Sequence, residues 1–332
     1  VKIQTPYEGT NYHGHFTDAE VRELGVPLVT GDIPGFVVMI GPAPSTEEAV
    51  ETIKGYQSRG IFVFLIGGII MAALGADPFA ALKYLFQGAF GSRANIGTTL
   101  SKSTPLMFTA LCACFAYKCG VFNLGGEGQF LMGAMAAFLT AYFSGLTGFA
   151  GILLALLAGT LAGGLWGLVP GILKVTRGQN EMIISIMLNY VATLFMGVLY
   201  TSWIRDENIP QTPAISKLVQ LPRVIANMRF TWGFVLALVV GLVLYYVLFW
   251  TSGGFKLRAV GYNMTASRFN GIPVKRYILT SFIISGAIAG LGGGAELLGT
   301  QFRLINGFGA GYGFDGVAMA LIGQLHPIAT MV

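Results

Sequence analysis

The chain alternates long apolar runs with shorter polar loops along most of its length. Six runs are long enough to form helices that cross a bilayer, which takes about 17–25 apolar residues. These runs cover residues 103–120, 129–148, 149–173, 182–202, 231–250 and 277–299. Because lipid offers no hydrogen bonds to the backbone, each run is expected to be a helix. The pattern therefore predicts an all-α polytopic membrane protein.

Two further apolar segments raise the expected number of transmembrane helices to about seven or eight. Residues 60–76 fit either a short membrane helix of roughly 26 Å or the last strand of a preceding soluble segment. Residues 313–332 begin another apolar run, which His326 and Pro327 interrupt before the sequence ends. We therefore expect a membrane domain over residues 69–332 that is incomplete at its C-terminus.

The segment 1–68 has a different character, with more charge and several turn prolines. Its pattern is that of a strand, then a turn and a helix, then a second strand, over residues 33–41, 42–60 and 61–68. Ser45 and Glu48 form a capping box at the start of the helix. The segment is predicted to be a short soluble βαβ unit on the cytoplasmic side of the membrane.

Composition agrees with the pattern of apolar runs. The chain is 54% hydrophobic and 11% charged, with a mean hydropathy of +0.68, whereas soluble domains carry about 25% charged residues. The net charge is +5, but the basic residues lie in short loops and form no single basic face. No nucleic-acid partner is expected for such a distribution.

The basic residues predict the orientation of the spans, because short cytoplasmic loops carry an excess of lysine and arginine. Lys174 and Arg177 follow the run 149–173, and the loop 251–276 is basic with no acidic residue. Both loops are expected to be cytoplasmic. Alternation then places the polar segment 203–230 outside.

A glycine-rich stretch, GVFNLGGEGQF at residues 120–130, places the acid Glu127 between two apolar runs. If the stretch is a cytoplasmic turn, Glu127 is a solvated loop acid or an ordinary charge at a helix N-terminus. If it is a helix break within the bilayer, a buried carboxylate costs several kcal/mol without a partner, which favours a functional role. In that case Asn123, Gln129 and Asn189 could share hydrogen bonds in the same cavity.

A second stretch repeats the first in outline. Residues 123–137 and 311–324 each contain glycines, then an acid followed by glycine, then an apolar helix. Asp315 stands in the second stretch where Glu127 stands in the first. Duplicated halves with broken helices near the membrane midplane are a recurrent plan in transporters, where helix ends face a polar solute. The expected solute pathway therefore comprises Asn123, Glu127, Gln129, Asn189 and Asp315.

The basic loop at residues 253–277 is long enough for a short surface helix between two spans. It suits docking on a cytoplasmic partner, and the alternative is an ordinary positively charged cytoplasmic loop. The residues expected to make the contact are Lys256, Arg258, Asn263, Arg268 and Gly271. The chain has no catalytic set and no Walker-type phosphate loop, so no enzymatic activity or cofactor is expected, and ATP-driven work would need another chain.

Cysteine is the last candidate for chemistry. Cys112, Cys114 and Cys119 lie close together in one predicted span, without histidine or acidic neighbours. Small packing residues are the simpler interpretation of this cluster, and neither a metal site nor a disulfide framework is expected.

Four phrases in order carry a resemblance: GVFNLGGEGQF, NEMIISIMLNYVA (180–192), LRAVGYNMTASRFNGIPVKR (257–276) and GYGFDGVAMALIG (311–323). From about residue 69 the chain resembles permease subunits of ABC importers of the branched-chain amino acid and ribose type, in the nucleoside and simple-sugar branch. The resemblance implies alternating access in a bacterial or archaeal plasma membrane. It also implies an ATP-binding cassette ATPase subunit at the region matching 257–271, a second permease subunit, an extracytoplasmic solute-binding lipoprotein and membrane lipid as partners.

Residues 21–68 resemble a different protein, the N-terminal region of acetyl-CoA synthase, which works with carbon monoxide dehydrogenase. The segment contains no cysteine, although that enzyme's metal cluster needs cysteines from a distant region. The two resemblances predict a chimera with its junction near residues 61–69. The alternative function is then a fragment of the acetyl-CoA synthase enzyme.

Overall fold

The structure is a computed structural model that describes residues 68–75, 77–206, 209–225 and 228–331. The chain divides into two compact units, Val1–Phe86 and Gln87–Val332. In the first unit, residues 68–73 are helical and the helix α3 (Pro78–Phe90) begins. The predicted βαβ unit and the acetyl-CoA-synthase-like segment lie, except for Gly68, outside the described residues.

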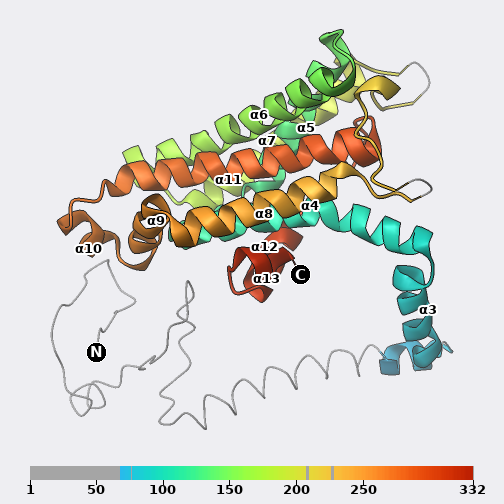
Figure 1. The fold of residues 1–332 in the computed structure, drawn as a ribbon, viewed down its shortest axis with the longest axis horizontal. Helices are drawn as coiled ribbons and strands as arrows, with labels where there is room; N and C mark the ends of the chain where they lie inside the picture. The colour runs from blue at the N-terminus through green and yellow to red at the C-terminus, as the bar shows by residue number, and fades with distance from the viewer. Residues whose placement is uncertain (1–67, 76, 207–208, 226–227, 332) are drawn as a thin grey trace. The chain divides into compact units, whose positions relative to one another are not determined.

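The second unit is built from helices that run back and forth (Figure 1). The helices are α4 (Arg93–Lys118), α5 (Gly126–Phe143), α6 (Gly148–Arg177), α7 (Glu181–Val198), α8 (Trp232–Trp250), α9 (Ser252–Tyr262), α10 (Met264–Phe269), α11 (Val274–Glu296), α12 (Tyr312–Ile322) and α13 (Pro327–Met331). Short turns of other helical types follow α7 at Leu199–Trp203, precede α8 at Lys217–Val219 and follow α11 at Leu297–Gln301. Among the described residues, pairing of the β type is limited to isolated bridges. The all-helical prediction is confirmed for this part of the chain.

All six predicted spans are helices, and most of their ends fall within a few residues of the prediction. The exception is α4, which begins at Arg93 and not at residue 103. The loop predicted to contain a short surface helix contains two, α9 and α10. The interrupted C-terminal run forms α12 and α13 on either side of His326.

Four of the described helices are long and apolar enough to cross a membrane: Gly148–Arg177, Glu181–Trp203, Trp232–Trp250 and Val274–Gln301. The expected number of about seven or eight spans is thus not confirmed. Helices α4 and α5 are long enough but not apolar enough to be counted with these four, because both carry polar side chains. Many of their residues are buried by other helices, and a helix enclosed by protein can be less apolar than one facing lipid.

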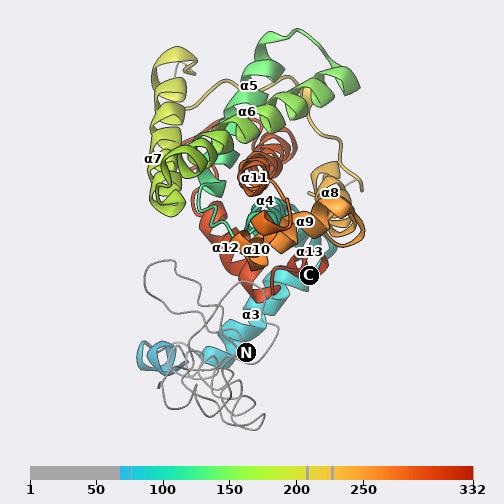
Figure 2. The same ribbon diagram turned by 90° about the vertical axis from the view of Figure 1, so that its left-hand side faces the viewer.

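Helix α11 lies in the middle of the bundle, with α4 beside it and α6, α8 and α12 around them (Figure 2). Close approach between α6 and α11 depends on glycine. A Cβ atom on Gly163 would lie 2.6 Å from the Cα atom of Gly290, and one on Gly290 would lie 2.8 Å from Gly163 Cα. Such contacts replace large side chains as the source of helix association in membranes.

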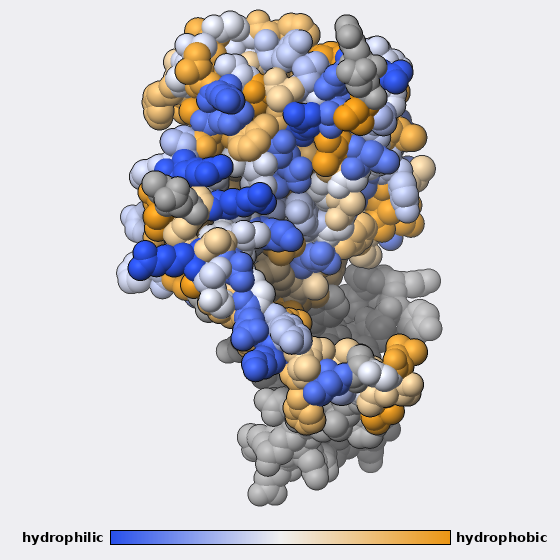
Figure 3. All heavy atoms as spheres, turned by 90° about the vertical axis from the view of Figure 1, so that its right-hand side faces the viewer, coloured by the Kyte–Doolittle hydropathy of each residue, from blue (hydrophilic) through white to orange (hydrophobic). Residues whose placement is uncertain are grey.

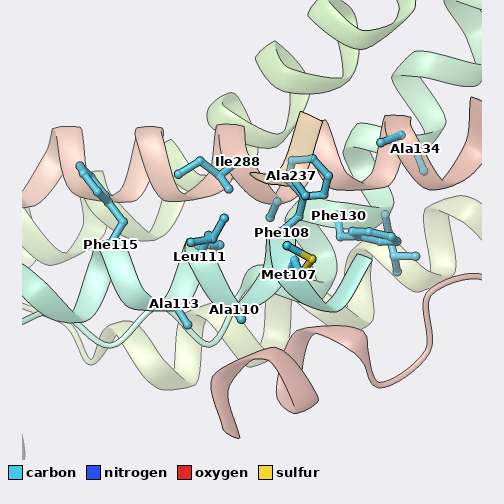
Figure 4. Packing of buried hydrophobic residues seen from close by; sticks show 14 of the residues in the cluster. Met107, Phe108, Ala110, Leu111, Ala113, Phe115, Phe130, Ala134, Ala237 and Ile288 are labelled. Atoms are coloured by element: carbon cyan, nitrogen blue, oxygen red, sulfur yellow. The ribbon is translucent and has the colours of Figure 1, made fainter. Parts of the chain in front are cut away.

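The other face of α11 packs against the larger side chains of α4. Phe108 and Leu111 of α4 are fully buried near Ile288 of α11 (Figure 4). Phe130 of α5 and Ala237 of α8 complete the contact from either side. The core is therefore made of bulky residues on one side of α11 and of glycine on the other.

The polar segment before α8 is tied to the end of α11 by its backbone. We call residues 211–221 the cover segment; Figure 1 shows it at the end of the bundle opposite α9 and α10. Figure 3 looks at this end and shows hydrophilic residues gathered across it. The hydrogen bonds run from Thr212 N to Leu304 O (3.0 Å), Leu304 N to Thr212 Oγ1 (2.9 Å), Ile215 N to Phe302 O (2.9 Å) and Leu221 N to Leu298 O (2.8 Å).

We predict that Thr212→Val loosens the cover segment. Thr212 is fully buried, and its hydroxyl accepts the Leu304 N–H, which the variant leaves unpaired at about 1–3 kcal/mol. Hydrogen exchange of the Leu304 amide should accelerate at least fivefold. The matched control is Thr201→Val, because the Thr201 hydroxyl is exposed and bonds only within its own helix. Equal exchange at Leu304 in both variants would show that the hydroxyl does not hold the cover segment.

Candidate functional site

A polar cluster surrounds the break between α4 and α5. Asn123 and Gln129, each 1% exposed, join through both side-chain amides, with Asn123 Nδ2 3.0 Å from Gln129 Oε1 and Gln129 Nε2 3.1 Å from Asn123 Oδ1. Asn123 Nδ2 also donates to Ser285 Oγ of α11 (2.8 Å), and Asn123 Oδ1 accepts the Gly125 N–H (3.0 Å). The pair thereby ties the break to the central helix.

Asn189 of α7 fixes the break from the other side. Its Oδ1 accepts the Gly128 N–H (2.9 Å), and its Nδ2 donates to the carbonyl oxygen of Leu124 (2.9 Å). Both backbone groups lie at the start of α5, where a helix leaves N–H groups without internal partners. One buried side chain therefore pairs two backbone groups that the break would leave unsatisfied.

The structure thus brings together three predicted site residues, Asn123, Gln129 and Asn189. Their hydrogen-bonding groups are engaged with one another and with the backbone. In this conformation they hold the broken helix in place and do not point free groups into a cavity.

Glu127 lies in the first turn of α5 and is half-buried. Its carboxyl group faces the backbone of Gly311 and the carboxyl group of Asp315. Its Oε2 atom is buried and has no hydrogen-bond partner among the described residues. Glu127 is therefore at the helix break and turned toward α12.

The two similar stretches meet at their helix starts. A Cβ atom on Gly313 of α12 would lie 2.5 Å from the Glu127 backbone nitrogen, so the two backbones are in contact. Thr109 of α4 holds α12 there, with Oγ1 2.8 Å from the Tyr312 carbonyl oxygen. Asp315 is exposed at this point. Both acids predicted for the solute pathway are thus brought to one place.

Sequence reasoning missed several polar residues. Ser285 and Cys112 belong to the amide cluster, and the Cys112 thiol lies 3.7 Å from Gln129 Oε1. Glu296 is 3% exposed at the end of α11. A signal for Glu296 was present, because it is the sole charged residue of the apolar run 277–299 and an ionisable residue within a span is a functional candidate.

Helices α9 and α10 enclose a groove of about 710 Å³ at the opposite end from the cover segment. Its lining includes Lys256, Tyr262 and Asn263. Phe255 and Tyr262 are 63% and 65% exposed, and Phe269 is 88% exposed. The start of the helix break touches α9, because a Cβ atom on Gly120 would lie 3.0 Å from Gly261 Cα.

The five residues predicted for this loop fall into two groups. Lys256 and Arg268 are exposed. Arg258 turns inward, with its guanidinium carbon 4.8 Å from the ring centre of Phe249, and Asn263 caps α10 by accepting the Ala266 N–H (2.9 Å). Gly271 has a φ of 75°, which other residues rarely adopt.

Arg258, Asn263 and Gly271 therefore shape the loop, and Lys256 and Arg268 remain open for contact.

The part of the chain that the structure describes contains no group of three or more histidine, cysteine or acidic residues placed to hold a metal ion.

Comparison with known proteins adds a second line of evidence. Residues 95–332 match the family described as branched-chain amino acid transport system, permease component. The chain is 36% identical to the guanosine ABC transporter permease protein NupP of Bacillus subtilis, over 77% of this chain and 75% of the relative. It is 33% identical to the nucleoside ABC transporter permease protein NupB of Lactococcus lactis, over 82% and 78%.

A third relative widens the range of solutes. The chain is 31% identical to the glucose ABC transporter permease protein TsgB13 of Haloferax volcanii, over 78% of this chain and 71% of the relative. No solved structure matches the chain. These matches bear out the permease resemblance, whereas the resemblance of residues 21–68 to acetyl-CoA synthase finds no support in them.

Proposed function

Because the chain belongs to the permease-component family of branched-chain amino acid transport systems, we propose that it is the permease subunit of an ATP-driven importer of a nucleoside. Several relatives are named for guanosine or nucleosides, and one is named for glucose. A nucleoside is therefore the first choice of solute and a simple sugar the second. The protein works in the plasma membrane of a bacterium or archaeon.

The observation that carries this proposal is the polar helix break inside an apolar bundle. Half-helix starts near the midplane are where transporters contact polar solutes. Here the starts of α5 and α12 meet, and Glu127 Oε2 is unpaired among the described residues. In the proposal, Glu127 and Asp315 line the solute pathway, and Asn123, Gln129 and Asn189 keep its wall in shape.

ATP hydrolysis belongs to a separate ATPase subunit, which docks on the groove of α9 and α10. Exposed aromatic residues beside a cavity are typical of a protein interface, and Phe255, Tyr262 and Phe269 have this exposure. Lys256 and Arg268 supply charge at the rim. The contact between Gly261 and Gly120 gives the ATPase a direct mechanical link to the helix break.

This docking site makes the α9–α10 end cytoplasmic, and the proposal keeps the sequence-based prediction that residues 1–68 are cytoplasmic. The cover segment faces outward, where a solute-binding lipoprotein delivers the solute. A second permease subunit completes the pathway; Bacillus subtilis has two guanosine ABC transporter permease proteins among the relatives, NupP and NupQ. The remaining apolar surface contacts membrane lipid.

We predict that reversing one charge at the groove weakens ATPase binding. Lys256→Glu should lower the amount of ATPase subunit that copurifies with the permease at least threefold, because it places an acid at the basic rim. Lys217→Glu is the matched control, since Lys217 is exposed in the cover segment at the opposite end. If the two variants retain the same amount of ATPase, the groove is not the docking site.

The choice of solute is tested by competition in cells. A host without nucleoside importers, carrying this chain and its partner subunits, should take up radiolabelled guanosine. An excess of unlabelled uridine should block the uptake, and an excess of leucine should leave it unchanged. Uptake that leucine blocks and uridine does not would assign the chain to amino acids.

A further inference from the structure

Glu296 is a buried acid that the proposed pathway does not yet use. It ends α11 and is 3% exposed. Its Oε1 accepts a hydrogen bond from Gln301 Nε2 at 3.3 Å. Its Oε2 is buried and accepts no hydrogen bond from any residue that the structure describes. One oxygen of the carboxyl group is thus oriented by Gln301, and the other is buried and unpaired among the described residues.

The backbone around Glu296 leaves regular helical geometry. A π-helical turn, Leu297–Gln301, follows directly, and Phe302 has a φ of 60°. Turns of this kind inside helices are frequent at functional sites. The turn at Leu297–Gln301 places the side-chain amide of Gln301 within hydrogen-bond distance of the Glu296 carboxyl group.

Other polar groups gather at the same turn. Thr300 contacts the Glu296 carboxyl group and lies 3.3 Å from the hydroxyl of Ser101 on α4. Tyr312 of α12 interacts electrostatically with Glu296 and packs edge-on against Phe130, with ring centres 5.8 Å apart. Phe130 lies one turn after Glu127 on α5. The neighbourhood of Glu296 is thus continuous with the helix starts of the proposed pathway.

The cover segment closes over this turn. Leu221 donates to the Leu298 carbonyl oxygen, and Ile215 donates to that of Phe302. Leu298 belongs to the π-helical turn, and Phe302 follows the turn directly in sequence. The turn therefore lies at the cover-segment end of the bundle, whereas the start of the break, at Gly120, lies against Gly261 of α9.

An unpaired carboxylate oxygen in a membrane protein is costly unless a donor reaches it during the working cycle. Building on the proposed function, we propose that Glu296 contacts the solute, with Oε2 accepting a hydrogen bond from a sugar hydroxyl group. Guanosine and glucose, the solutes for which two relatives are named, both carry neighbouring hydroxyl groups. The ligand class is a neutral molecule with a hydroxylated sugar.

The test uses the complete complex, permease with its partner subunits, in lipid nanodiscs. Guanosine, 2′-deoxyguanosine and 3′-deoxyguanosine are compared by the concentration that half-stimulates ATP hydrolysis. The wild type should prefer guanosine over at least one deoxy analogue by about tenfold or more, because a site built for a hydroxyl rejects the analogue without it. Glu296→Gln should reduce this preference to about twofold or less, by raising the half-stimulating concentration of guanosine most.

Glu181→Gln is the matched control, because Glu181 pairs with Lys174 (2.7 Å) far along the chain from the turn, and this variant should keep the preference. If Glu296 had a merely structural role, Glu296→Gln would change the half-stimulating concentrations of guanosine and of its analogues by the same factor. If Glu296→Gln does not assemble, Gln301→Leu serves instead. It removes the amide that orients the carboxyl group and should lower the preference at least threefold.

The outcomes separate the two proposals. If the wild type responds to guanosine but Glu296→Gln or Gln301→Leu keeps its full preference, the role of Glu296 is wrong and the proposed function stands. The same holds if the wild type shows no preference over either analogue. If none of guanosine, uridine and glucose stimulates the wild type, the proposed function is wrong, and the role of Glu296 fails with it.

Discussion

Gly290→Ala is expected to prevent the second unit from packing, whereas Gly294→Ala, one turn away on α11, is expected to be tolerated. A Cβ atom on Gly290 would fall against the Gly159 carbonyl oxygen and 2.8 Å from Gly163 Cα. These atoms are backbone, so α6 and α11 would have to move apart. A Cβ atom on Gly294 would meet only side chains at 3.4 and 3.5 Å and the Leu156 Cα at 3.9 Å, which are ordinary contacts.

Overpacking of this kind costs about 1–3 kcal/mol or more even where the surroundings can shift. The measurement is the yield of monodisperse protein after detergent extraction, together with its melting temperature. Gly290→Ala should give less than a tenth of the wild-type yield, or melt at least about 5 °C lower. Equal yield and melting for the two variants would mean that α6 and α11 do not pack through Gly290.

Asn189→Leu is the second change with a large expected effect. It would leave the Gly128 N–H and the Leu124 carbonyl group unpaired at the helix break, at about 1–3 kcal/mol for each group. Solute uptake per assembled complex should fall at least tenfold, because α5 loses its fixed starting point. Asn189→Asp keeps the acceptor for the Gly128 N–H and loses the donor to the Leu124 carbonyl oxygen. Its solute uptake should therefore lie between that of Asn189→Leu and that of the wild type.

The control for this position is Thr193→Val, one turn further along α7. Thr193 is exposed, and its hydroxyl bonds only to the carbonyl oxygen of its own helix. Its uptake should match that of the wild type. Uptake by Asn189→Leu equal to that of Thr193→Val would show that transport does not depend on the two hydrogen bonds of Asn189.

The apolar runs were enough to predict the long helices, because a span in lipid leaves the backbone no alternative to a helix. The start of α4 was missed because its first turns carry polar and charged residues, among them Arg93 and Lys102, which interrupt the apolar run. A local signal was available there, since Ser92 caps the helix by accepting the Asn95 N–H (3.1 Å).

The sequence indicated which residues belong near the helix break but not how they pair. The hydrogen bond between Asn123 and Ser285 depends on how α11 packs, and the hydrogen bonds of Asn189 to the backbone depend on the position of α7. Neither contact has a signature in the local sequence. The inward turn of Arg258 onto Phe249 likewise follows from the packing of α9 on α8, whereas the capping role of Asn263 could have been read from its residue type before a short helix.

Glu296 shows a different limit of prediction from the sequence. A glycine-rich apolar run was interpreted as an ordinary span, although its single acid argued for a special environment. The π-helical turn that gives Glu296 its partner in Gln301 has no clear sequence pattern, so only the structure reveals the arrangement.

The central claim is that this chain is an ATP-driven importer subunit for a nucleoside, and uptake into proteoliposomes tests it most directly. The complete complex is reconstituted, ATP is supplied on the side of the α9–α10 groove, and radiolabelled guanosine with the binding lipoprotein is supplied on the other. We expect guanosine to accumulate above its external concentration with ATP and not with a non-hydrolysable analogue. Accumulation of leucine in place of guanosine, or equilibration of guanosine without ATP, would contradict the account.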